Sequence, residues 1–397
     1  MSTEMRNDTP AGFDPLGFAA TGLSTAGLAA IERLQEALTR DVRPLLADAW
    51  ESATMPAAVL DTLVPLHLMR PAGMDAADAD SSTFSGWRNY VLARTDVSVA
   101  TLYNAQSGLF RTAVRLGGSP AQAVELDEAI RSFSLRGVFA LTEPGHGSDI
   151  AGGMATRARR DGDGWVIDGA KRWIGGADTA DVLAVFARDD TDGEVRAFLV
   201  PRDAAGVTLT RIEGKTSLRP MQNFDIALDA VRVPESARLQ GVESWRDVSR
   251  ILRAMRSDVA WIATGLQAGA LDAAVVYVRD REQFGRPLGG FQLVQEKLAR
   301  MLANLTSSLG IVTQLSRQQD RGVFADENSA LAKMQTALLA RETVALGREV
   351  LGGNGILLEH SAARFFADAE AVYSYEGTHE VNALIVGRAL TGSSAFV

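Results

Sequence analysis

The spacing of apolar residues along the chain changes character twice. In the first third, up to about Phe133, apolar residues recur every three or four positions. A clear series is Leu28, Ile31, Leu34 and Leu38. Because this spacing places side chains on one face of a helix, it predicts an amphipathic helical region. A second set, Leu92, Val99 and Leu102, falls at i, i+7 and i+10 and predicts a single continuous helix.

The middle of the chain, from Ser134 to about Leu239, has the pattern of β-strands. It contains short apolar or β-branched runs at 165–167, 182–187 and 197–200. The segment Asp161-Gly162-Asp163-Gly164 precedes the first of these runs and predicts a hairpin turn.

Helical spacing returns after Val242, where one apolar face extends over four turns. Its residues are Val294, Leu298, Met301, Leu305 and Leu309. The chain therefore reads as mainly α with a central β domain. We predict a flexible N-terminus at 1–23, an α-helical domain at 24–133, a β domain at 134–241 and an α-helical bundle domain at 242–397.

Composition narrows the classes of function. The 397 residues carry a net charge of −9 without a basic cluster, which argues against a nucleic-acid partner. The chain has no Cys, its four His match no zinc spacing, and only four of its 40 basic residues are Lys. The N-terminal residues lack the apolar core of a signal peptide. The apolar run 259–271 is shorter than the roughly 20 residues of a membrane span. We expect a cytoplasmic protein with no metal site and no membrane partner.

Two candidate motifs lie in the β region. Residues 139–149, FALTEPGHGSD, run from an apolar strand into a loop of small residues. The hydroxyls of Thr142 and Ser148 and the exposed backbone of this loop can bind a ligand, although a plain Pro-Gly turn has the same pattern. Residues 171–176, KRWIGG, place a Trp before two Gly. This Trp either forms a wall for a flat ring system or belongs to the core beside a bulge.

Three further motifs lie in the C-terminal helical region. In 281–288, REQFGRPL, the arginine can neutralise a pyrophosphate and the phenylalanine can stack on adenine, or the segment simply ends a helix. The Gly-rich turn 351–356, LGGNGI, suits a phosphate but also a helix stop. In 373–382, YSYEGTHEVN, Glu376 is either a general base or a first-turn acid that complements a helix dipole.

In this order, the five motifs resemble those of the acyl-CoA dehydrogenase family over about 24–392, with the closest similarity to its glutaryl-CoA dehydrogenases and short-chain acyl-CoA oxidases. The resemblance implies an α-helical N-terminal domain, a β-barrel-like middle domain and a C-terminal four-helix bundle. It implies FAD bound between the middle and C-terminal domains and completed by a neighbouring subunit of a homotetramer. It also implies an acyl-CoA substrate, with an electron-transfer flavoprotein or dioxygen as electron acceptor.

The resemblance also assigns roles to residues. Glu376 would be the base that removes the α-proton, since the other family position for the base is occupied here by Met255, just before Arg256. Cofactor contacts would be Phe139, Leu141, Thr142, Ser148, Trp173, Ile174, Gly175, Arg281, Phe284, Gln292 and Thr378, with Glu349, Gly352 and Gly353 reaching the FAD from a neighbouring chain. Substrate contacts would be Ala100, Ser148, Arg256, Tyr375 and Gly377.

The sequence departs from the family at three positions. Ala100 stands where glutaryl-CoA dehydrogenases carry an Arg for the distal carboxylate of the substrate, which favours a monocarboxylic acyl-CoA. Arg94 or Arg111 remains as a substitute for that Arg. Gly175 replaces the usual Thr or Ser, as in the oxidases, and either leaves room for dioxygen or marks lineage only. Glu349 stands where Gln or Met is commoner.

Three functions therefore compete. The leading one is a dehydrogenase that forms a trans-2-enoyl-CoA, and the second is an acyl-CoA oxidase. The third is a non-catalytic flavin-fold scaffold or carrier-protein binding module.

Overall fold

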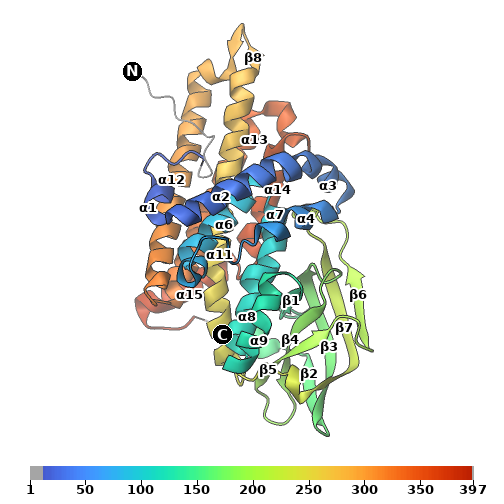
Figure 1. Cartoon of the computed structure of the whole chain (residues 1–397). Coiled ribbons are helices and arrows are strands. Elements are labelled where there is room, and N and C mark those ends of the chain that lie inside the picture. Colours follow the sequence, from blue (N-terminus) through green and yellow to red (C-terminus); the bar gives the residue numbers. More distant parts are fainter. Residues whose placement is uncertain (1–11, 396–397) are drawn as a thin grey trace. The chain divides into compact units, whose positions relative to one another are not determined.

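The computed structural model describes residues 12–395 as a mainly helical chain with one central sheet (Figure 1). These residues fall into two compact units. The helical unit comprises the described residues up to Thr101, the short segment Thr216–Pro220, and the described residues from Arg256 onward. The sheet unit comprises Leu102–Lys215 and Met221–Met255.

The helical unit begins with short helices. They are α1 (Phe18–Gly22), α2 (Thr25–Ala37), a π-helical turn (Leu38–Val42), 3-10 turns at Arg43–Leu45 and Val64–Leu66, α3 (Leu46–Ser52), α4 (Ala57–Leu63), α5 (Ala76–Ala79), α6 (Ser82–Thr95) and α7 (Val97–Asn104). The predicted series Leu28 to Leu38 lies on α2 and the turn that continues it. Of the segment predicted to be a flexible N-terminus, residues 1–11 lie outside the described part of the chain, and α1 occupies part of the remainder.

The prediction of one continuous helix through Leu92 and Leu102 is wrong, because Asp96 separates α6 from α7. Its backbone is extended, with φ −166° and ψ 136°. Its carboxylate accepts hydrogen bonds from the backbone N–H groups of Ser98 (2.8 Å) and Val99 (3.3 Å), as an N-cap does. A buried Asp that caps a new helix interrupts the old one without disturbing the apolar spacing.

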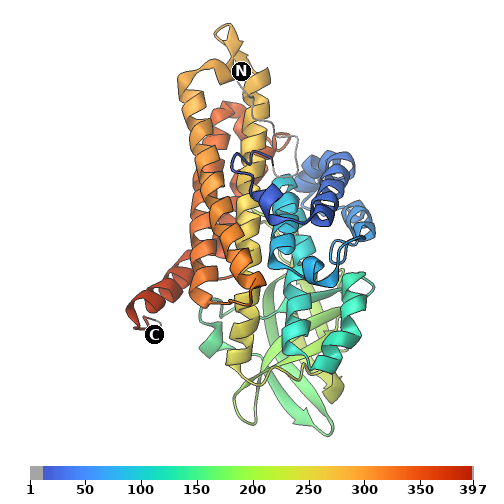
Figure 2. The same cartoon turned by 60° about the vertical axis from the view of Figure 1, so that its left-hand side comes forward.

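The C-terminal part of the helical unit is a bundle of long helices that run side by side (Figure 2). Its elements are α11 (Trp245–Asp280), a small hairpin of β8 (Glu282–Gln283) and β9 (Arg286–Pro287), 3-10 turns at Leu288–Gly290 and Gly352–Ile356, α12 (Gln292–Asp320), α13 (Asp326–Val350), α14 (Ser361–Ser374) and α15 (His379–Thr391). Buried Gln267 on α11 joins three helices, since its Nε2 donates to Ser308 Oγ on α12 (2.9 Å) and Thr336 O on α13 (3.1 Å).

The sheet unit contains one seven-stranded sheet and several helices. The strands are β1 (Gly137–Ala140), β2 (Arg157–Asp161), β3 (Gly164–Gly175), β4 (Val182–Asp189), β5 (Val195–Pro201), β6 (Val207–Arg211) and β7 (Asn223–Pro234). The helices are a π-helical turn (Ala105–Phe110), α8 (Arg111–Gly117), α9 (Pro120–Arg131), α10 (Ile150–Gly153) and a 3-10 turn (Glu235–Ala237). The strand order is β1-β4-β2-β3-β7-β6, with β5 paired to β4.

The sheet is buried on both faces at β4. Leu183, Val185 and the other alternate residues pack into a core with Trp165 and Phe198, whose rings lie 5.2 Å apart. Phe186 belongs instead to a second apolar cluster with Ile251 and other residues of the helices. Because successive side chains of a strand point to opposite faces, this alternation accounts for the continuous apolar run in the sequence.

The predicted fold class is confirmed, with helical parts before and after a curled central sheet. The predicted hairpin at 161–164 connects β2 to β3, where Asp161 pairs with Gly164. The predicted strands and the helical face at 294–309 lie in β3, β4, β5 and α12. The three predicted domain boundaries differ from the limits of the two compact units and stay predictions.

Among the described helices, α11 is long and apolar enough to cross a membrane by length and composition. However, 78% of its most apolar 18-residue window is buried inside the protein. Core helices of soluble proteins have the same property, so this helix is weak evidence for a membrane span. The expected cytoplasmic location stays a prediction.

Candidate active site

Glu376 lies on the short loop between α14 and α15, in a backbone conformation that side chains disfavour. Its φ is +54°, and that of Gly377 is +85°. A left-handed conformation at a residue other than glycine costs about 1–3 kcal/mol and is found preferentially at functional sites. Two candidate cofactor contacts share it, Trp173 with φ +66° and Phe284 with φ +52°. The fold therefore holds three of the predicted site residues in strained conformations.

Two buried side chains fix the loop that carries Glu376. Nζ of Lys333, on α13, donates to the carbonyl oxygens of Tyr373 (2.8 Å) and Gly377 (2.7 Å). Nδ2 of Asn382, on α15, donates to the carbonyl oxygens of Gly377 (2.9 Å) and Thr378 (3.0 Å). The predicted cofactor contact Thr378 is also the N-cap of α15.

The charge environment of Glu376 suits a general base. Burial raises the pKa of its carboxyl, while the positive charges of Arg256 and Lys333 oppose that rise. Burial also raises the pKa of the neighbouring Tyr375 hydroxyl. A carboxylate whose pKa is raised toward neutrality is a better proton acceptor than an ordinary one.

The alternative role of Glu376, complementing a helix dipole, belongs to another residue. The acidic residue in the first turn of α15 is Glu380. Hydrogen bonds, first from its own backbone N–H and then from Thr378, lower the pKa of the exposed Glu380 carboxyl. Glu376 lies before α15 begins, and the pKa of its carboxyl is raised by burial, whereas a helix dipole would lower it.

The other predicted substrate contacts in the helical unit are Ala100, Arg256, Tyr375 and Gly377. Ala100, on α7, is fully buried. Arg256 is 9% exposed and lies near enough to Glu376 and Lys333 to affect the pKa of both. The structure thus brings Arg256 and Tyr375 together with Glu376.

In the sheet unit, a buried ion pair fixes the first motif. Lys171 Nζ contacts Glu143 Oε1 at 2.9 Å and donates to the carbonyl oxygen of Leu141 at 3.1 Å. The Glu143 carboxylate also accepts hydrogen bonds from the backbone N–H groups of Ala155 (2.7 Å) and Thr156 (2.9 Å). The pair therefore closes the loop 143–155 at its base, and that loop contains Ser148.

The sheet unit brings the first two motifs together. The Arg172 N–H donates to the carbonyl oxygen of Thr142 at 2.8 Å, so the start of the loop lies beside β3. Ser148 is exposed and Phe139 is half-buried. The side chains of Leu141 and Ile174 belong to the apolar clusters, so any cofactor contact of theirs would be through the backbone.

Trp173 is not a core residue. It is 51% exposed and lies within a register irregularity between β3 and β7. The Arg172 guanidinium lies 4.9 Å from the centre of its ring. The segment KRWIGG therefore contains a strand irregularity, but its Trp does not belong to the core. The exposed ring of Trp173 is an aromatic surface that a ligand can reach.

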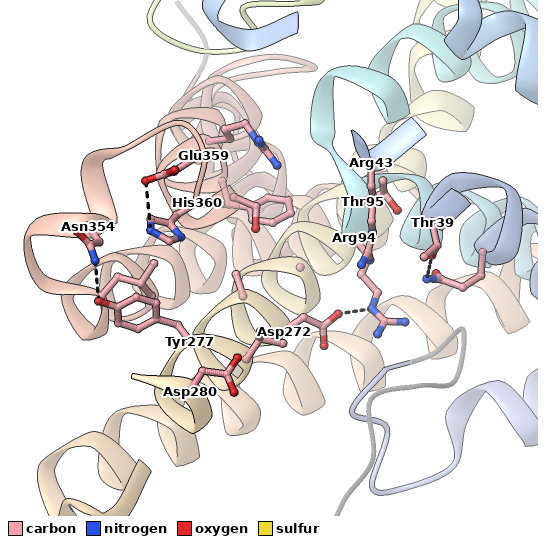
Figure 3. Close-up of a pocket in the computed structure, with 18 of the residues that line it drawn as sticks. Thr39, Arg43, Arg94, Thr95, Asp272, Tyr277, Asp280, Asn354, Glu359 and His360 are labelled. Atoms are coloured by element: carbon pink, nitrogen blue, oxygen red, sulfur yellow. Dashed lines mark hydrogen bonds and ion pairs between the residues drawn. The ribbon is translucent and has the colours of Figure 1, made fainter. Parts of the chain in front are cut away.

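The third and fourth motifs meet in the helical unit. A cavity of about 1250 Å³ is lined by Arg281, by Leu351 and Asn354 of the Gly-rich turn, and by Tyr277. Figure 3 shows Asn354 and Tyr277 side by side in its lining. Asn354 Nδ2 donates to the Tyr277 hydroxyl at 2.9 Å. Arg281 and the Gly-rich turn of one chain thus face a common cavity, whereas they were expected to reach one FAD from two chains. That two-chain arrangement stays a prediction.

The remaining predicted cofactor contacts lie outside the lining of this cavity. They are Phe284, Gln292, Glu349, Gly352 and Gly353, and all five are exposed. Phe284, in the β8–β9 turn, is 93% exposed. Glu349 forms an ion pair with Lys297 at 2.8 Å. The accessible aromatic rings, Arg281 and the glycine backbone have the chemistry that a flavin nucleotide requires.

Sequence reasoning missed four residues that fix the candidate segments: Glu143, Lys171, Lys333 and Asn382. It also missed Arg40, Arg43 and Arg364, which line the cavity together with Arg94 and Arg281. The lysines carried a usable signal, since lysine is rare in this chain.

Comparison with known proteins identifies similar sequences and structures. The family model described as "Acyl-CoA dehydrogenase, middle domain" matches residues 138–231, and "Acyl-CoA dehydrogenase, C-terminal domain" matches residues 244–391. The mitochondrial short-chain specific acyl-CoA dehydrogenase of Bos taurus is 30% identical over 354 residues, covering 87% of this chain and 85% of that protein.

Two solved structures resemble the whole chain. Glutaryl-CoA dehydrogenase from Mycobacterium smegmatis has a TM-score of 0.89 and 36% identity, covering 97% of this chain and 99% of that one. A glutaryl-CoA dehydrogenase from the same organism in complex with FADH2 has a TM-score of 0.90 and 31% identity, covering 98% and 100%.

Proposed function

Because the chain belongs to the acyl-CoA dehydrogenase family, we propose that it is a FAD-dependent enzyme that converts a monocarboxylic acyl-CoA to the trans-2-enoyl-CoA. The observation that carries this proposal is Glu376. It is held on a strained, side-chain-fixed loop, and burial raises the pKa of its carboxyl between two cationic residues. A scaffold or carrier-binding module has no need of such a carboxylate.

In the proposed reaction, Glu376 removes a proton from the α-carbon of the thioester. FAD, when bound, accepts the hydride that leaves the β-carbon, so the C–C single bond becomes a double bond. Glu376 is half-buried, which reduces the contact of its carboxylate with water and strengthens its basicity. The strained loop fixes the carboxylate before substrate arrives, so little conformational entropy is lost in the reaction.

The residues of this chain fit FAD in chemical type. Trp173 and Phe284 offer accessible rings for flat ring systems, and Arg281 offers a cation beside a cavity for the pyrophosphate. Phe139, Leu141, Thr142, Ser148, Ile174, Gly175 and Thr378 would complete the flavin contacts. Gln292 would contact the ADP half, and Glu349, Gly352 and Gly353 would reach the FAD from a neighbouring chain.

Two ion pairs support a substrate without a distal carboxylate. Both arginines that could replace the missing Arg at Ala100 are engaged with carboxylates. Arg94 Nε lies 2.6 Å from Asp272, and Arg111 Nε lies 2.9 Å from Asp127. Recruiting either one to a substrate carboxylate would break a pair in which the arginine is largely buried.

We propose a dehydrogenase that passes electrons to an electron-transfer flavoprotein and assembles as a homotetramer. The experiment is a titration of the purified protein under argon with neutral acyl-CoAs of graded length and branching. The protein should release FAD on denaturation, and at least one acyl-CoA should bleach the flavin absorbance. Peroxide formation in air that equals turnover with an artificial acceptor would identify an oxidase instead. A protein without flavin, or with flavin that no acyl-CoA bleaches, would contradict the proposal.

A further inference from the structure

Lys333 is fully buried on α13, and it donates to carbonyl oxygens on both sides of Glu376. We propose that Lys333 is a positioning residue for Glu376, which holds the 373–377 segment and places a positive charge beside the carboxylate. This inference rests on the proposed function of Glu376 as the base.

The geometry of the two hydrogen bonds supports the positioning role. One reaches Tyr373 O in the last turn of α14, and the other reaches Gly377 O just after Glu376. A single ammonium group therefore spans the residue whose φ is +54°. Asn382 shares the Gly377 carbonyl oxygen but does not reach the Tyr373 side of the loop through any hydrogen bond that the described residues show. Among the hydrogen bonds of Lys333 and Asn382 in the described residues, those of Lys333 join the two ends.

Burying an ammonium group is costly, so a fully buried lysine at this position points to a role beyond packing. Burial lowers the pKa of Lys333 to about 8, even though the negative charge of Glu376 opposes this effect. An apolar side chain of similar length would avoid the desolvation cost. The ammonium remains charged at neutral pH and stabilises the ionised form of its neighbour.

The charged groups around the carboxylate come from three helices. Arg256 on α11 and Lys333 on α13 favour the ionised form of Glu376, against the effect of burial. The negative charge of Glu380 on α15 favours the charged form of Lys333. Removing the charge of Lys333 leaves Arg256 as the only cation that acts on the pKa of Glu376 within the described residues. We therefore expect Glu376 to bind its proton more tightly without Lys333.

The test is the pH dependence of flavin bleaching by a good acyl-CoA substrate, in the FAD-loaded protein. Lys333→Met removes the charge and both hydrogen bonds, and Lys333→Arg keeps the charge. Thr336→Val is the matched control, because Thr336 is equally buried on the same helix, and within the described residues its hydroxyl donates to the backbone carbonyls of Ala332 and Lys333, not to the 373–377 segment. Hydrogen exchange of residues 373–382 provides a second measurement that does not depend on catalysis.

In Lys333→Met, the acid limb of the rate profile should move by about one pH unit to higher pH, a tenfold loss of rate at a fixed pH on that limb. The amides of 373–382 should exchange faster than in Thr336→Val, whose acid limb should match that of the wild type. In Lys333→Arg, which keeps the positive charge, the acid limb should lie close to its wild-type position. If Lys333→Met does not fold, Lys333→Gln, which also lacks the charge, is judged by the same criterion.

A charge-free variant whose acid limb coincides with that of the wild type overturns the inference. So does a Thr336→Val variant that shifts the limb by the same amount, because the effect would then come from helix packing. Failure of the proposed function is distinguishable, since in that case the wild type itself would show no bleaching and no acid limb.

Discussion

The Cε atom of Met221 lies 2.5 Å from the position that a Cβ on Gly175 would occupy. Real side chains do not approach so closely, so the thioether fills the space that the missing side chain leaves. Met221 is itself 1% exposed. Lys215 Nζ donates hydrogen bonds to the carbonyl oxygen of Met221 and to Asn223 Oδ1, which holds this segment in place. The glycine at 175 therefore does not leave a void for dioxygen, and the argument for an oxidase from this position is weakened.

Gly175→Ser should destabilise the protein by about 1 kcal/mol, because the new side chain overlaps only the flexible end of a buried methionine, which can move. Adding Met221→Ala should recover part of that loss, since the smaller side chain makes room. The free energies of unfolding of the two single variants and the double variant, measured with urea, form a double-mutant cycle. Strictly additive effects would show that the two residues do not share this space.

Replacing the proposed base gives the most direct functional prediction. Glu376→Gln keeps the shape of the side chain but cannot accept the α-proton. Flavin bleaching by acyl-CoA should slow by at least about 10³-fold, a barrier change of roughly 4 kcal/mol, while FAD content stays normal. Glu327→Gln, exposed at the first turn of α13, is the control and should change the rate little. Stopped-flow absorbance measures both. A normal bleaching rate in Glu376→Gln would show that the base is elsewhere.

Much of the fold follows from sequence, because helical and strand periods differ clearly between 24–133, 134–241 and the remainder. What the pattern misses is the break at Asp96, since the buried carboxylate satisfies the backbone N–H groups of α7. The apolar spacing is unchanged across such a break. Asp96 lies between apolar positions of the helical pattern, and tertiary contacts decide whether such a residue caps a helix. One of these contacts is the hydrogen bond from Trp50 Nε1 to Asp96 (2.9 Å).

The candidate segments could be proposed from sequence motifs, but the side chains that hold these segments in place could not. The sequence contains only four lysines. Three of them, Lys171, Lys215 and Lys333, donate to backbone carbonyls of segments at or beside candidate site residues, and Lys297 pairs with Glu349. Arginine is the usual basic residue of this chain, and the three buried or half-buried lysines each place a compact ammonium group against at least one backbone carbonyl and a second oxygen. The scarcity of lysine was visible in the sequence, but the partners are distant in sequence.

The buried pair of Glu143 and Lys171 should be costly to break. Lys171→Met leaves a buried carboxylate without its cation and should destabilise the protein by about 3–5 kcal/mol. Lys171→Met with Glu143→Gln should cost less than Lys171→Met alone. Chemical denaturation measures each, and Arg157→Met, at an exposed position on β2, provides the control. An equal loss in the single and double variants would contradict the pairing.

The lowered pKa of Lys171 leads us to predict that the stability of the protein depends on pH. Burial lowers the pKa of Lys171 to about 8, below the value of about 10.5 for an unfolded chain. Between these values the unfolded chain binds more protons, so this group makes stability rise with pH through that window. The slope should be smaller in the variant with Lys171→Met and Glu143→Gln. An unchanged slope would show that Lys171 titrates normally in the folded protein.

Assembly and FAD binding should be linked if the cofactor is shared between chains. Phe284, exposed to 93% in the strained β8–β9 turn, and Arg281 are the side chains expected to engage it. Arg281→Ala should lower FAD occupancy and loosen the oligomer, because ligand binding to the assembled state stabilises that state. Arg33→Ala, an exposed arginine on α2, should do neither. Light scattering with absorbance measures both quantities. A 42.4 kDa monomer that retains FAD would contradict shared sites.

The alanine at position 100 leads us to predict an acyl group without a distal carboxylate. With Arg94 and Arg111 already paired with carboxylates, a distal carboxylate in the acyl pocket would have no partner at this position. Butyryl-CoA should therefore exceed glutaryl-CoA in kcat/KM by about 10²-fold or more, because an unpaired buried charge costs several kcal/mol. Ala100→Arg should narrow the ratio, whereas Ala100→Leu, which adds bulk without charge to the same fully buried site, should not. Both variants are compared at equal FAD content. Similar kcat/KM values for the two substrates in the wild type would place the acyl pocket away from Ala100.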